Sequence, residues 1–445
     1  LANASGTGCL CTIMGLILAA LMQVKAPAEP IRNLSAGLQK QAMNRIVLLS
    51  LLFAAHAAAG EGLDTLVTDG KAGLDLRYRY ESVEQADKPS TAGANTLRLR
   101  LNLASGSVNG FSGFAEFDHV QVIGGEHYDS TRNGLTNYPV VADPEGTDLN
   151  QIYLQYAGPA GTTVRLGRQR IRLDNERFIG PSAWRQNEQT FDAFSLETKA
   201  LPGATATYIY INEVRRVFGP DPGAPAETFD SNSHVLNLKL TKLPVGALTF
   251  YGYFLDFDNA PQLSADTYGA RYDGSHALGE KMKFGWALEY AQQRDAGDNL
   301  ASIDADYSLI ELSLKGSAVG VIAGWEVLSG ESGTFTSTTN PAFQTPLATL
   351  HKWQGWADKF LTTPSAGIED TYVGINGSFA GFIGQAVWHD FQAEATSLDY
   401  GTELDLLVSR KFAKRYEVLV KYADYSADGL FTDTRKFWLQ FGAAF

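Results

Sequence analysis

Cysteine, long apolar runs and catalytic motifs are what this sequence has least of. Its two cysteines are Cys9 and Cys11, so no disulfide can form within residues 60–445. Beyond Gly60 there is no apolar run near the roughly twenty residues that a membrane-spanning helix requires. Ser182 stands in GPSAW and not in a G-x-S-x-G elbow, and H-E-x-x-H is absent. These absences argue against a disulfide scaffold, a helical membrane protein and the common hydrolases. We expect no enzyme activity, no metal and no cofactor.

Positive charge is also scarce for a chain of this length. The first 59 residues hold four of the 36 Lys and Arg residues and one of the 49 Asp and Glu residues, which leaves a formal net charge of −16 on residues 60–445. A field of that sign repels phosphates, so nucleic acid is not an expected partner.

The first 59 residues have the pattern of leader sequence. Residues 43–59, MNRIVLLSLLFAAHAAA, combine a basic start at Arg45, a short apolar run and small residues, which is typical of a secretory signal peptide cleaved near Ala59. Residues 1–42 then form an upstream leader outside the mature protein. A short membrane helix in the run CLCTIMGLILAALM is the alternative for this segment. We therefore place the folded domain at residues 60–445.

Glycine and aromatic residues are plentiful, with 44 Gly, 24 Phe and 19 Tyr. Many of them fall in segments of about ten residues that alternate between apolar and polar side chains and end in turn residues. This pattern predicts an all-β fold of about 18 strands. The expected strands are residues 72–83, 94–104, 111–122, 148–157, 162–171, 190–199, 204–215, 232–241, 246–257, 264–273, 282–294, 304–316, 319–328, 368–378, 380–391, 398–410, 415–425 and 432–445.

The links between these segments alternate between short and long. GPAG at 158–161 and ALPG at 200–203 are short, whereas the links at 123–147, 172–189, 216–231 and 329–367 are long. Transmembrane barrels have short periplasmic turns and long extracellular loops, and the connections of a soluble β-sandwich do not sort in this way. We therefore predict a transmembrane antiparallel up-and-down β-barrel in the bacterial outer membrane, with both termini on the periplasmic side.

The alternation also predicts which side chains face the lumen. In LDLRYRYE at 74–81 the Leu and Tyr residues share one parity and the charged residues the other, and TLRLRLNL at 96–103 repeats this arrangement. A charge that faces lipid costs about 2–4 kcal/mol at the bilayer midplane, so we place the charged set inside a water-filled pore. The basic residues expected to line the pore are Arg77, Arg79, Arg98, Arg100, Arg165, Arg168, Arg170, Lys199, Lys239, Arg271 and Lys421.

Two interpretations of these basic residues remain open. Inward arginines on neighbouring strands attract anions, as in anion-selective channels. The same arginines also suit ladders in which Arg and Glu pair across a closed lumen, since acids such as Glu289 and Glu403 occur on the later strands. The first interpretation predicts an anion channel, and the second predicts a structural or adhesive barrel.

Six arginines crowd into the hairpin expected at 162–199, with Arg168 and Arg170 in the parity of Leu166, so either a bulge occurs there or both lie above the membrane. Within it, GRQRIRLDNERFIGPSAWRQNEQTFDAF at 167–194 resembles the corresponding strand-loop-strand of the alginate export family, outer-membrane porins of Gram-negative bacteria. The resemblance extends to PAFQTPLATLHKWQGWADKFLTTP at 341–364 and to the strand pattern at both ends. It implies a monomeric porin and an acidic polysaccharide such as alginate as the solute.

The longest link, 329–367, carries apolar and basic side chains together. A loop of this length with apolar content of its own folds onto another surface, which in a porin is the lumen or the rim. We expect it either to gate or constrict the pore or to form a cap on neighbouring loops. The residues expected in a gating loop are Phe343, His351, Lys352, Trp353, Trp356 and Lys359.

The end of the sequence, KFWLQFGAAF, sets Phe437, Leu439, Phe441 and Phe445 in one register, which resembles the terminal strand that the barrel assembly machinery reads. The expected function is passive diffusion of an anionic solute, an alginate-like polysaccharide or an organic acid, through a channel embedded in outer-membrane lipid and lipopolysaccharide. The alternatives are a structural or adhesive barrel with a salt-bridged closed lumen and an uptake porin for small organic acids.

Overall fold

The computed structural model describes residues 63–445, so the leader and signal peptide expected at 1–59 lie outside the described residues. The described part opens with one short helix, α3 (Leu63–Thr68), and is otherwise almost entirely β-structure. No helix within residues 63–445 is long and apolar enough to cross a membrane. The strands are β1 (Lys71–Gln85), β2 (Ala92–Ala104), β3 (Phe111–Val122), β4 (Gly146–Ala157), β5 (Thr163–Gln169), β6 (Thr190–Thr198), β7 (Ala204–Arg215), β8 (Thr228–Leu240), β9 (Ala247–Leu255), β10 (Ala265–Leu278), β11 (Met282–Asp295), β12 (Asp304–Lys315), β13 (Val319–Leu328), β14 (Ile368–Phe379), β15 (Phe382–Gln392), β16 (Asp399–Phe412), β17 (Tyr416–Ala427) and β18 (Thr434–Ala444).

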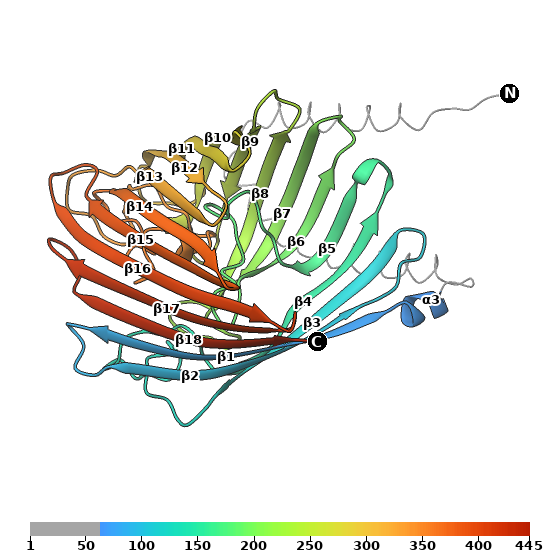
Figure 1. Cartoon of the computed structure of the whole chain (residues 1–445), viewed down its shortest axis with the longest axis horizontal. Coiled ribbons are helices and arrows are strands. Elements are labelled where there is room, and N and C mark those ends of the chain that lie inside the picture. Colours follow the sequence, from blue (N-terminus) through green and yellow to red (C-terminus); the bar gives the residue numbers. More distant parts are fainter. Residues whose placement is uncertain (1–62) are drawn as a thin grey trace. The chain divides into compact units, whose positions relative to one another are not determined.

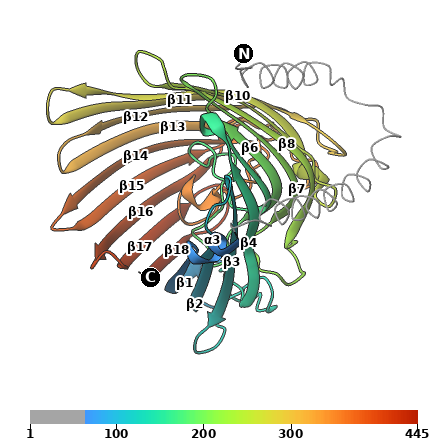
Figure 2. The ribbon, with the colours of Figure 1, turned by 90° about the vertical axis from the view of Figure 1, so that its right-hand side faces the viewer.

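The strands form one closed antiparallel sheet. Each strand pairs with its neighbours in sequence, and β1 closes the ring on β18, with Asp75 opposite Ala444 and Gln85 opposite Thr434. Figures 1 and 2 show β1 and β18 side by side, with the intervening strands wrapping round between them. The prediction of an up-and-down barrel of 18 strands is therefore confirmed.

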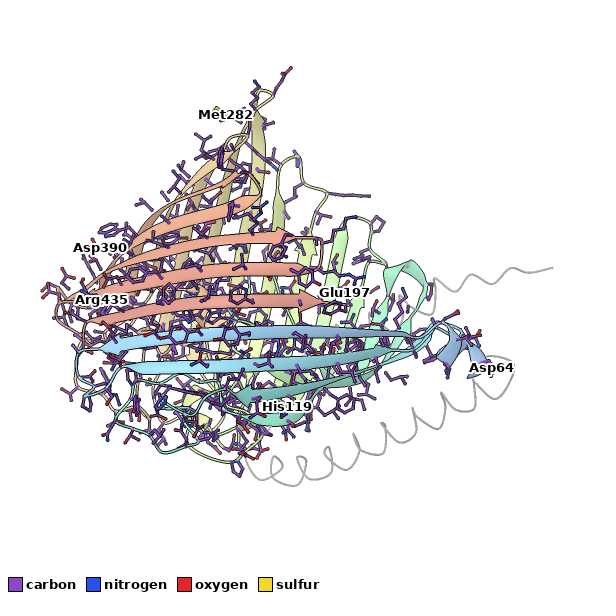
Figure 3. The ribbon with its side chains drawn as sticks, turned by 60° about the horizontal axis from the view of Figure 1, so that its bottom comes forward. Asp64, His119, Glu197, Met282, Asp390 and Arg435 are labelled. Carbon is purple, nitrogen blue, oxygen red and sulfur yellow. The ribbon has the colours of Figure 1, made fainter. Side chains whose placement is uncertain are left out.

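Short turns join the strands at one end of the barrel, and longer loops join them at the other. The three longest loops are residues 123–145, 170–189 and 329–367, and we name them by these numbers. Figure 3 separates the two ends: Arg435 and Asp390, near the loop ends of β18 and β15, lie on the left, and Glu197, near the turn end of β6, lies to their right.

The outer face of the sheet is apolar. On β2, Leu99, Leu101 and Leu103 are 40%, 38% and 43% exposed, whereas Arg98 and Arg100 are 5% and 8% exposed. Because side chains alternate along a strand, the leucines point away from the barrel and the arginines point into it. An exposed apolar belt of this kind is the surface with which a barrel meets lipid.

The hydrophobic core lies inside the barrel, where loop residues pack against inward side chains of the strands. Phe178 and Ile179 of loop 170–189 are buried together with Phe343 and Leu347 of loop 329–367, and all four pack against inward side chains of the strands such as Tyr307. A smaller cluster packs Tyr128 and Val141 of loop 123–145 against Val83, Ala92 and Ala94 at the loop ends of β1 and β2. Three loops therefore fold into a lumen that the strand pattern alone leaves empty.

Two β-bulges flank the basic hairpin, one in the β3–β4 pairing between Glu116 and Phe117 and one in the β6–β7 pairing between Asp192 and Ala193. The pairings of β5 itself are regular, so Arg168 keeps the parity of Leu166 and lies on the outer face. Arg170 follows the last residue of β5 and is no longer held to that parity. One bulge therefore lies on β4, beside β5, and the other on β7, beside β6, and the regular pairing of β5 leaves Arg168 outside the lumen.

Candidate functional site

Loops 170–189 and 329–367 meet inside the barrel. Ile179 and Leu347 form a parallel β-bridge, and the Gly180 N–H donates to Leu347 O at 2.9 Å. The Thr349 N–H donates to Glu176 O at 3.0 Å. Buried backbone groups need such partners, so these bonds hold the two loops as a single layer. We call this layer the partition.

The partition is attached to two nearby parts of the wall, between which lie β17 and β18. On one side the Arg77 guanidinium, on β1, donates to Gln186 Oε1 at 2.9 Å, and the Gln186 amide donates to Thr96 Oγ1 of β2 at 2.8 Å. On the other side the Ala357 N–H donates to Glu403 Oε1 of β16 at 2.7 Å. Loop 170–189 is therefore fixed to the first strands and loop 329–367 to the later ones.

Lys421 of β17 contacts both loops at once. Its ammonium lies 3.6 Å from the ring centroid of Trp356, 4.4 Å from that of Trp184 and 5.3 Å from that of Trp438 on β18. It also lies 2.7 Å from His351 Nε2. An ammonium can only donate, so Nε2 accepts and the ring proton sits on Nδ1. We call Lys421 with His351 and the three tryptophans the clamp.

Asp358 completes the polar network beside the clamp. His351 Nδ1 lies 2.7 Å from Asp358 Oδ1, and Asp358 Oδ2 accepts from Arg185 at 2.8 Å and from Lys436 at 2.6 Å. Burial alone raises the pKa of Asp358, but His351, Lys436 and Arg185 together hold the pKa of that carboxyl well below its ordinary value. Burial lowers the pKa of His351 well below its usual range, so the imidazole is neutral. Loop 329–367 therefore carries a buried, fully partnered charge.

Acidic partners neutralise several of the strand cations that the sequence placed in the pore. Arg100 lies 2.6 Å from Asp118 and 3.5 Å from Glu188, and Arg170 pairs with the same Glu188. Burial opposes the ionised form of Glu188, yet Arg100 and Arg170 lower its pKa below the ordinary value. The further pairs are Arg79 with Asp143 at 3.4 Å, Arg98 with Asp75 at 2.5 Å, Arg271 with Glu289 at 2.7 Å and, on the outer face, Arg168 with Asp192 at 2.7 Å.

The remaining strand cations of that set are scattered. Within residues 63–445 the acceptors of Arg77 are all neutral: the Gln186 side chain and the carbonyls of Ala183 and Arg185. Arg165 donates to Gln155, Lys199 is exposed beside Glu197 at the turn end, Lys239 lies on the inner face of β8, and Lys421 is in the clamp. The structure therefore brings Arg77, Arg79, Arg98 and Arg100 together on β1 and β2, under loop 170–189, and Arg170 of that loop shares Glu188 with Arg100.

Loop 329–367 places its predicted residues in three settings. Phe343 is in the core, and His351 and Trp356 are in the clamp. Trp353 has the Arg177 guanidinium and the Lys352 ammonium 5.4 and 5.3 Å from its ring centroid, and Lys352 Nζ donates to Asn175 O at 2.8 Å. Among the described residues, the one hydrogen-bond acceptor of Lys359 Nζ is Thr434 Oγ1, at 2.7 Å.

A cavity of about 710 Å³ lies at the loop end of the lumen, and we call it the outer cavity. Its basic lining residues are Lys88, Arg185, Arg216, Lys359 and Lys436, and its acidic ones are Asp129 and Asp358. Arg185 and Lys436 pair with Asp358, whereas Lys88, Arg216 and Lys359 have no carboxylate within ion-pair distance in residues 63–445. Three unpaired cations therefore surround one cavity.

Lys88 and Arg216 were missed by the sequence reasoning. Both stand in polar links outside the alternating segments, where parity assigns no face. Lys88 Nζ donates to Thr136 O at 2.9 Å, and Arg216 Nη1 donates to Ala226 O at 2.8 Å. Burial, with Arg132 nearby, lowers the pKa of Arg216 to about 10, which leaves it charged at neutral pH. The one available signal was Arg216 itself, a second arginine directly after the strand that ends at Arg215.

A second cavity, of about 390 Å³, lies between the partition and the walls of β12 to β15. Its charged lining residues are Arg271, Glu311, Glu326, Lys352 and Asp370. Arg177 reaches Glu326 at 2.7 Å, and His389 Nδ1 reaches Asp370 at 3.0 Å. This cavity therefore has more acids than bases, in contrast to the outer cavity.

Comparison with solved structures finds the same fold. OpdK, an outer membrane protein from Pseudomonas aeruginosa, is 15% identical with a TM-score of 0.67, over 85% of this chain and 99% of OpdK. OccAB2 from Acinetobacter baumannii is 16% identical with a TM-score of 0.67, over 86% of this chain and 99% of OccAB2. A structure of OpdK with vanillate gives 15% identity and a TM-score of 0.65, over 85% and 99% of the two chains. At these identities the likeness shows the fold.

Comparison by sequence identifies the family. No curated protein matches the sequence significantly. The family model described as alginate export matches residues 70–330, which is more than half of the chain, and the match ends before the segment 341–364. The closed barrel of 18 strands, its apolar outer belt and this match agree. The chain therefore belongs to the alginate export family and is a porin of the bacterial outer membrane.

Proposed function

We propose that this protein is a passive channel for anionic solutes, which it admits through the outer cavity. The observation that carries the proposal is the group formed by Lys88, Arg216 and Lys359, which line the outer cavity without an acidic partner in the described residues. Cations in a confined space with low-dielectric walls raise the local concentration of anions and speed their entry. The strand arginines contribute less to this field, because most of them are neutralised within the wall.

The outer cavity is basic, whereas the domain as a whole is acidic. Residues 60–445 carry a net charge of −16, so an anion that approaches most of the surface is repelled. The outer cavity holds five bases against two acids. The outer cavity therefore attracts anions, whereas the acidic remainder of the surface repels them. This contrast supports a role of the outer cavity in selecting anions over cations.

The family name favours an acidic polysaccharide such as alginate as the solute. One observation supports the alternative, a small organic acid: the partition crosses the lumen, and its two loops are joined by backbone hydrogen bonds. A polymer has to displace such a layer, whereas a small acid only has to pass around it. The structure of OpdK with vanillate, a small aromatic acid, also supports this second candidate.

Loop 329–367 constricts the channel in this proposal, and solutes diffuse through it without a catalysed reaction. Its surroundings are outer-membrane lipid and lipopolysaccharide. Insertion by the barrel assembly machinery fits the last strand, where Phe437, Phe441 and Phe445 are 38%, 48% and 53% exposed on the outer face.

The test is the reversal potential of the purified protein in planar bilayers under a potassium chloride gradient. We expect anion selectivity in the wild type, and a loss or inversion of that selectivity in the triple variant K88E/R216E/K359E. The matched control is K199E/K411E/K414E, which makes the same charge change at exposed positions near the turn end. A closed or cation-selective wild-type pore contradicts the proposal, and so does an equal effect of the two triple variants.

A further inference from the structure

We propose that the outer cavity is a binding site for a monocarboxylate with an apolar body, and that it discriminates against hydroxyl-rich uronates. This inference rests on the proposed function, because it names the class of anion that the channel admits. It follows from three features of the lining: where the unpaired cations lie, what surrounds them, and how few polar groups are left to bind hydroxyls.

Lys359 and Arg216 are the lining cations whose surroundings suit a carboxylate. Lys359 Nζ has one hydrogen-bond acceptor, Thr434 Oγ1, and an ammonium has three donors, so two donors remain for a ligand. The Arg216 guanidinium lies 4.6 Å from the ring centroid of Phe218 and 4.2 Å from that of Phe229. Stacked between rings and bonded to one carbonyl, it keeps free N–H groups in the fork geometry that suits a carboxylate.

Apolar side chains make up much of the remaining lining. Aliphatic side chains such as Val140, Val217, Leu350 and Leu361 form this wall, while the rings of Trp184 and Phe218 lie against His351 and Arg216. Ligand sites of roughly 300–1,000 Å³ with an apolar wall and a few polar groups are typical for small organic molecules. The outer cavity, at about 710 Å³, falls within that range.

Several polar groups of the lining are already bonded within the protein. The Ser182 hydroxyl donates to Ala348 O at 3.1 Å, and the Gln189 amide donates to Gly180 O at 2.8 Å and to Leu347 O at 2.9 Å. A uronate brings several hydroxyl groups, and each hydroxyl that is buried without a partner costs about 1–3 kcal/mol. An apolar carboxylate carries no such cost and gains by burying its body.

The site opens toward the loop end of the barrel. Val140 and Leu361 line the cavity and are 45% and 43% exposed, so they form its rim. Ala348, Leu350 and His351 of the partition line it as well. A solute added on the loop side therefore reaches the site directly, whereas a solute added on the turn side has to cross the partition first.

The experiment measures how organic acids interrupt the chloride current of single channels. The probes are benzoate and hexanoate, compared with glucuronate and gluconate, each added to one side at a time. A cysteine introduced by Lys281→Cys, at the turn end of a domain with no other cysteine, reports the orientation through a thiol reagent added to one side. We expect benzoate and hexanoate to reach half-block at concentrations at least about tenfold below those of the two hydroxylated acids, and from the loop side.

Two variants locate the site. Lys359→Gln raises the half-blocking concentration of benzoate by about tenfold, which corresponds to about 1.4 kcal/mol for one lost charged contact. Leu361→Ser raises it for benzoate and hexanoate and leaves glucuronate unchanged. Lys199→Gln, at the turn end, is the matched control and leaves the half-blocking concentrations of these acids unchanged. Lys359→Arg keeps the charge, so it retains block by benzoate and shows that any loss in Lys359→Gln is not a failure to fold.

The outcomes separate this inference from the proposed function. A pore that is closed or cation-selective overturns both. A pore that is anion-selective but is blocked equally by benzoate and glucuronate overturns the binding site and leaves the anion channel standing. Block from the turn side alone, or block that is insensitive to both Lys359→Gln and Leu361→Ser, also overturns the binding site.

Discussion

Replacing Lys421 by methionine tests whether the clamp holds the partition in place. Lys421 is the one side chain of β17 that contacts Trp184 of loop 170–189 and both His351 and Trp356 of loop 329–367. Methionine has a similar length and keeps apolar contact with the three rings, so the change removes the charge and the hydrogen bond and little else.

The size of the effect follows from those contacts. A cation buried against a tryptophan face contributes about 2 kcal/mol, and a hydrogen bond from a charged donor contributes about 1.5–3 kcal/mol. Methionine recovers part of this through packing, so we expect the docked state of the loops to lose about 2–4 kcal/mol. At about 1.4 kcal/mol per factor of ten, the ratio of undocked to docked loops rises roughly 30- to 700-fold.

The measurement is single-channel conductance in planar bilayers. Lys421→Met should show frequent steps to a higher conductance that are rare in the wild type. Lys411→Met makes the same substitution at an exposed position near the turn end of β16 and should behave as the wild type. If Lys421→Met inserts normally and its conductance trace matches that of the wild type, the clamp does not hold the partition and the reasoning fails.

Three further predictions concern charge and the long loop. Burial, together with the nearby Lys436, lowers the pKa of Lys359 to about 8, so its charge is present below that pH and is lost above it. Selectivity for chloride over potassium should therefore fall between pH 7 and pH 9.5 in the wild type and hold steady in Lys359→Arg, as reversal potentials will show. Arg100→Met leaves Asp118, Glu116 and Glu188 buried with one cation fewer, which should cost about 3–5 kcal/mol and lower the temperature at which the barrel unfolds on a gel. Arg435→Met removes an exposed pair with Asp424 and should leave that temperature unchanged within error. Deleting residues 336–363 should raise the single-channel conductance, and an unchanged conductance would mean that loop 329–367 is a cap and not a constriction.

Local alternation was enough to predict the strands. The segments expected at 111–122 and 319–328 correspond to β3 and β13 without any shift. The predicted strand ends are wrong where pairing with a neighbour extends a strand beyond its alternation of apolar and polar residues. β8 begins at Thr228 and not at 232, and β10 continues past 273 to Leu278, because its neighbour β11 supplies hydrogen bonds as far as Met282. Side-chain pattern sets the face of a strand, but the partner strand sets its length.

The alternation of side chains along a strand could not predict the ion-pair partners of the basic residues. Parity places Arg79 and Arg100 on the inner face but says nothing of what lies opposite them. Their partners Asp143 and Glu188 come from loops 123–145 and 170–189, and these loops reach the arginines only because their apolar residues are buried in the lumen. The position of a folded loop depends on contacts across the whole barrel, which a pattern of neighbouring residues does not contain.

The anion channel and the salt-bridged lumen, which the sequence presents as alternatives, concern different residues in the folded barrel. Arginines on the strands pair with acids and hold the loops inside, whereas Lys88, Arg216 and Lys359 stand in loops and remain unpaired around the outer cavity. Removing a strand arginine should therefore lower stability, and removing a loop cation should lower anion selectivity. Dissolved salt screens the electrostatic field of exposed charges much more than it screens buried ion pairs. The loss of anion selectivity should therefore become smaller as the ionic strength rises, and the loss of stability should not.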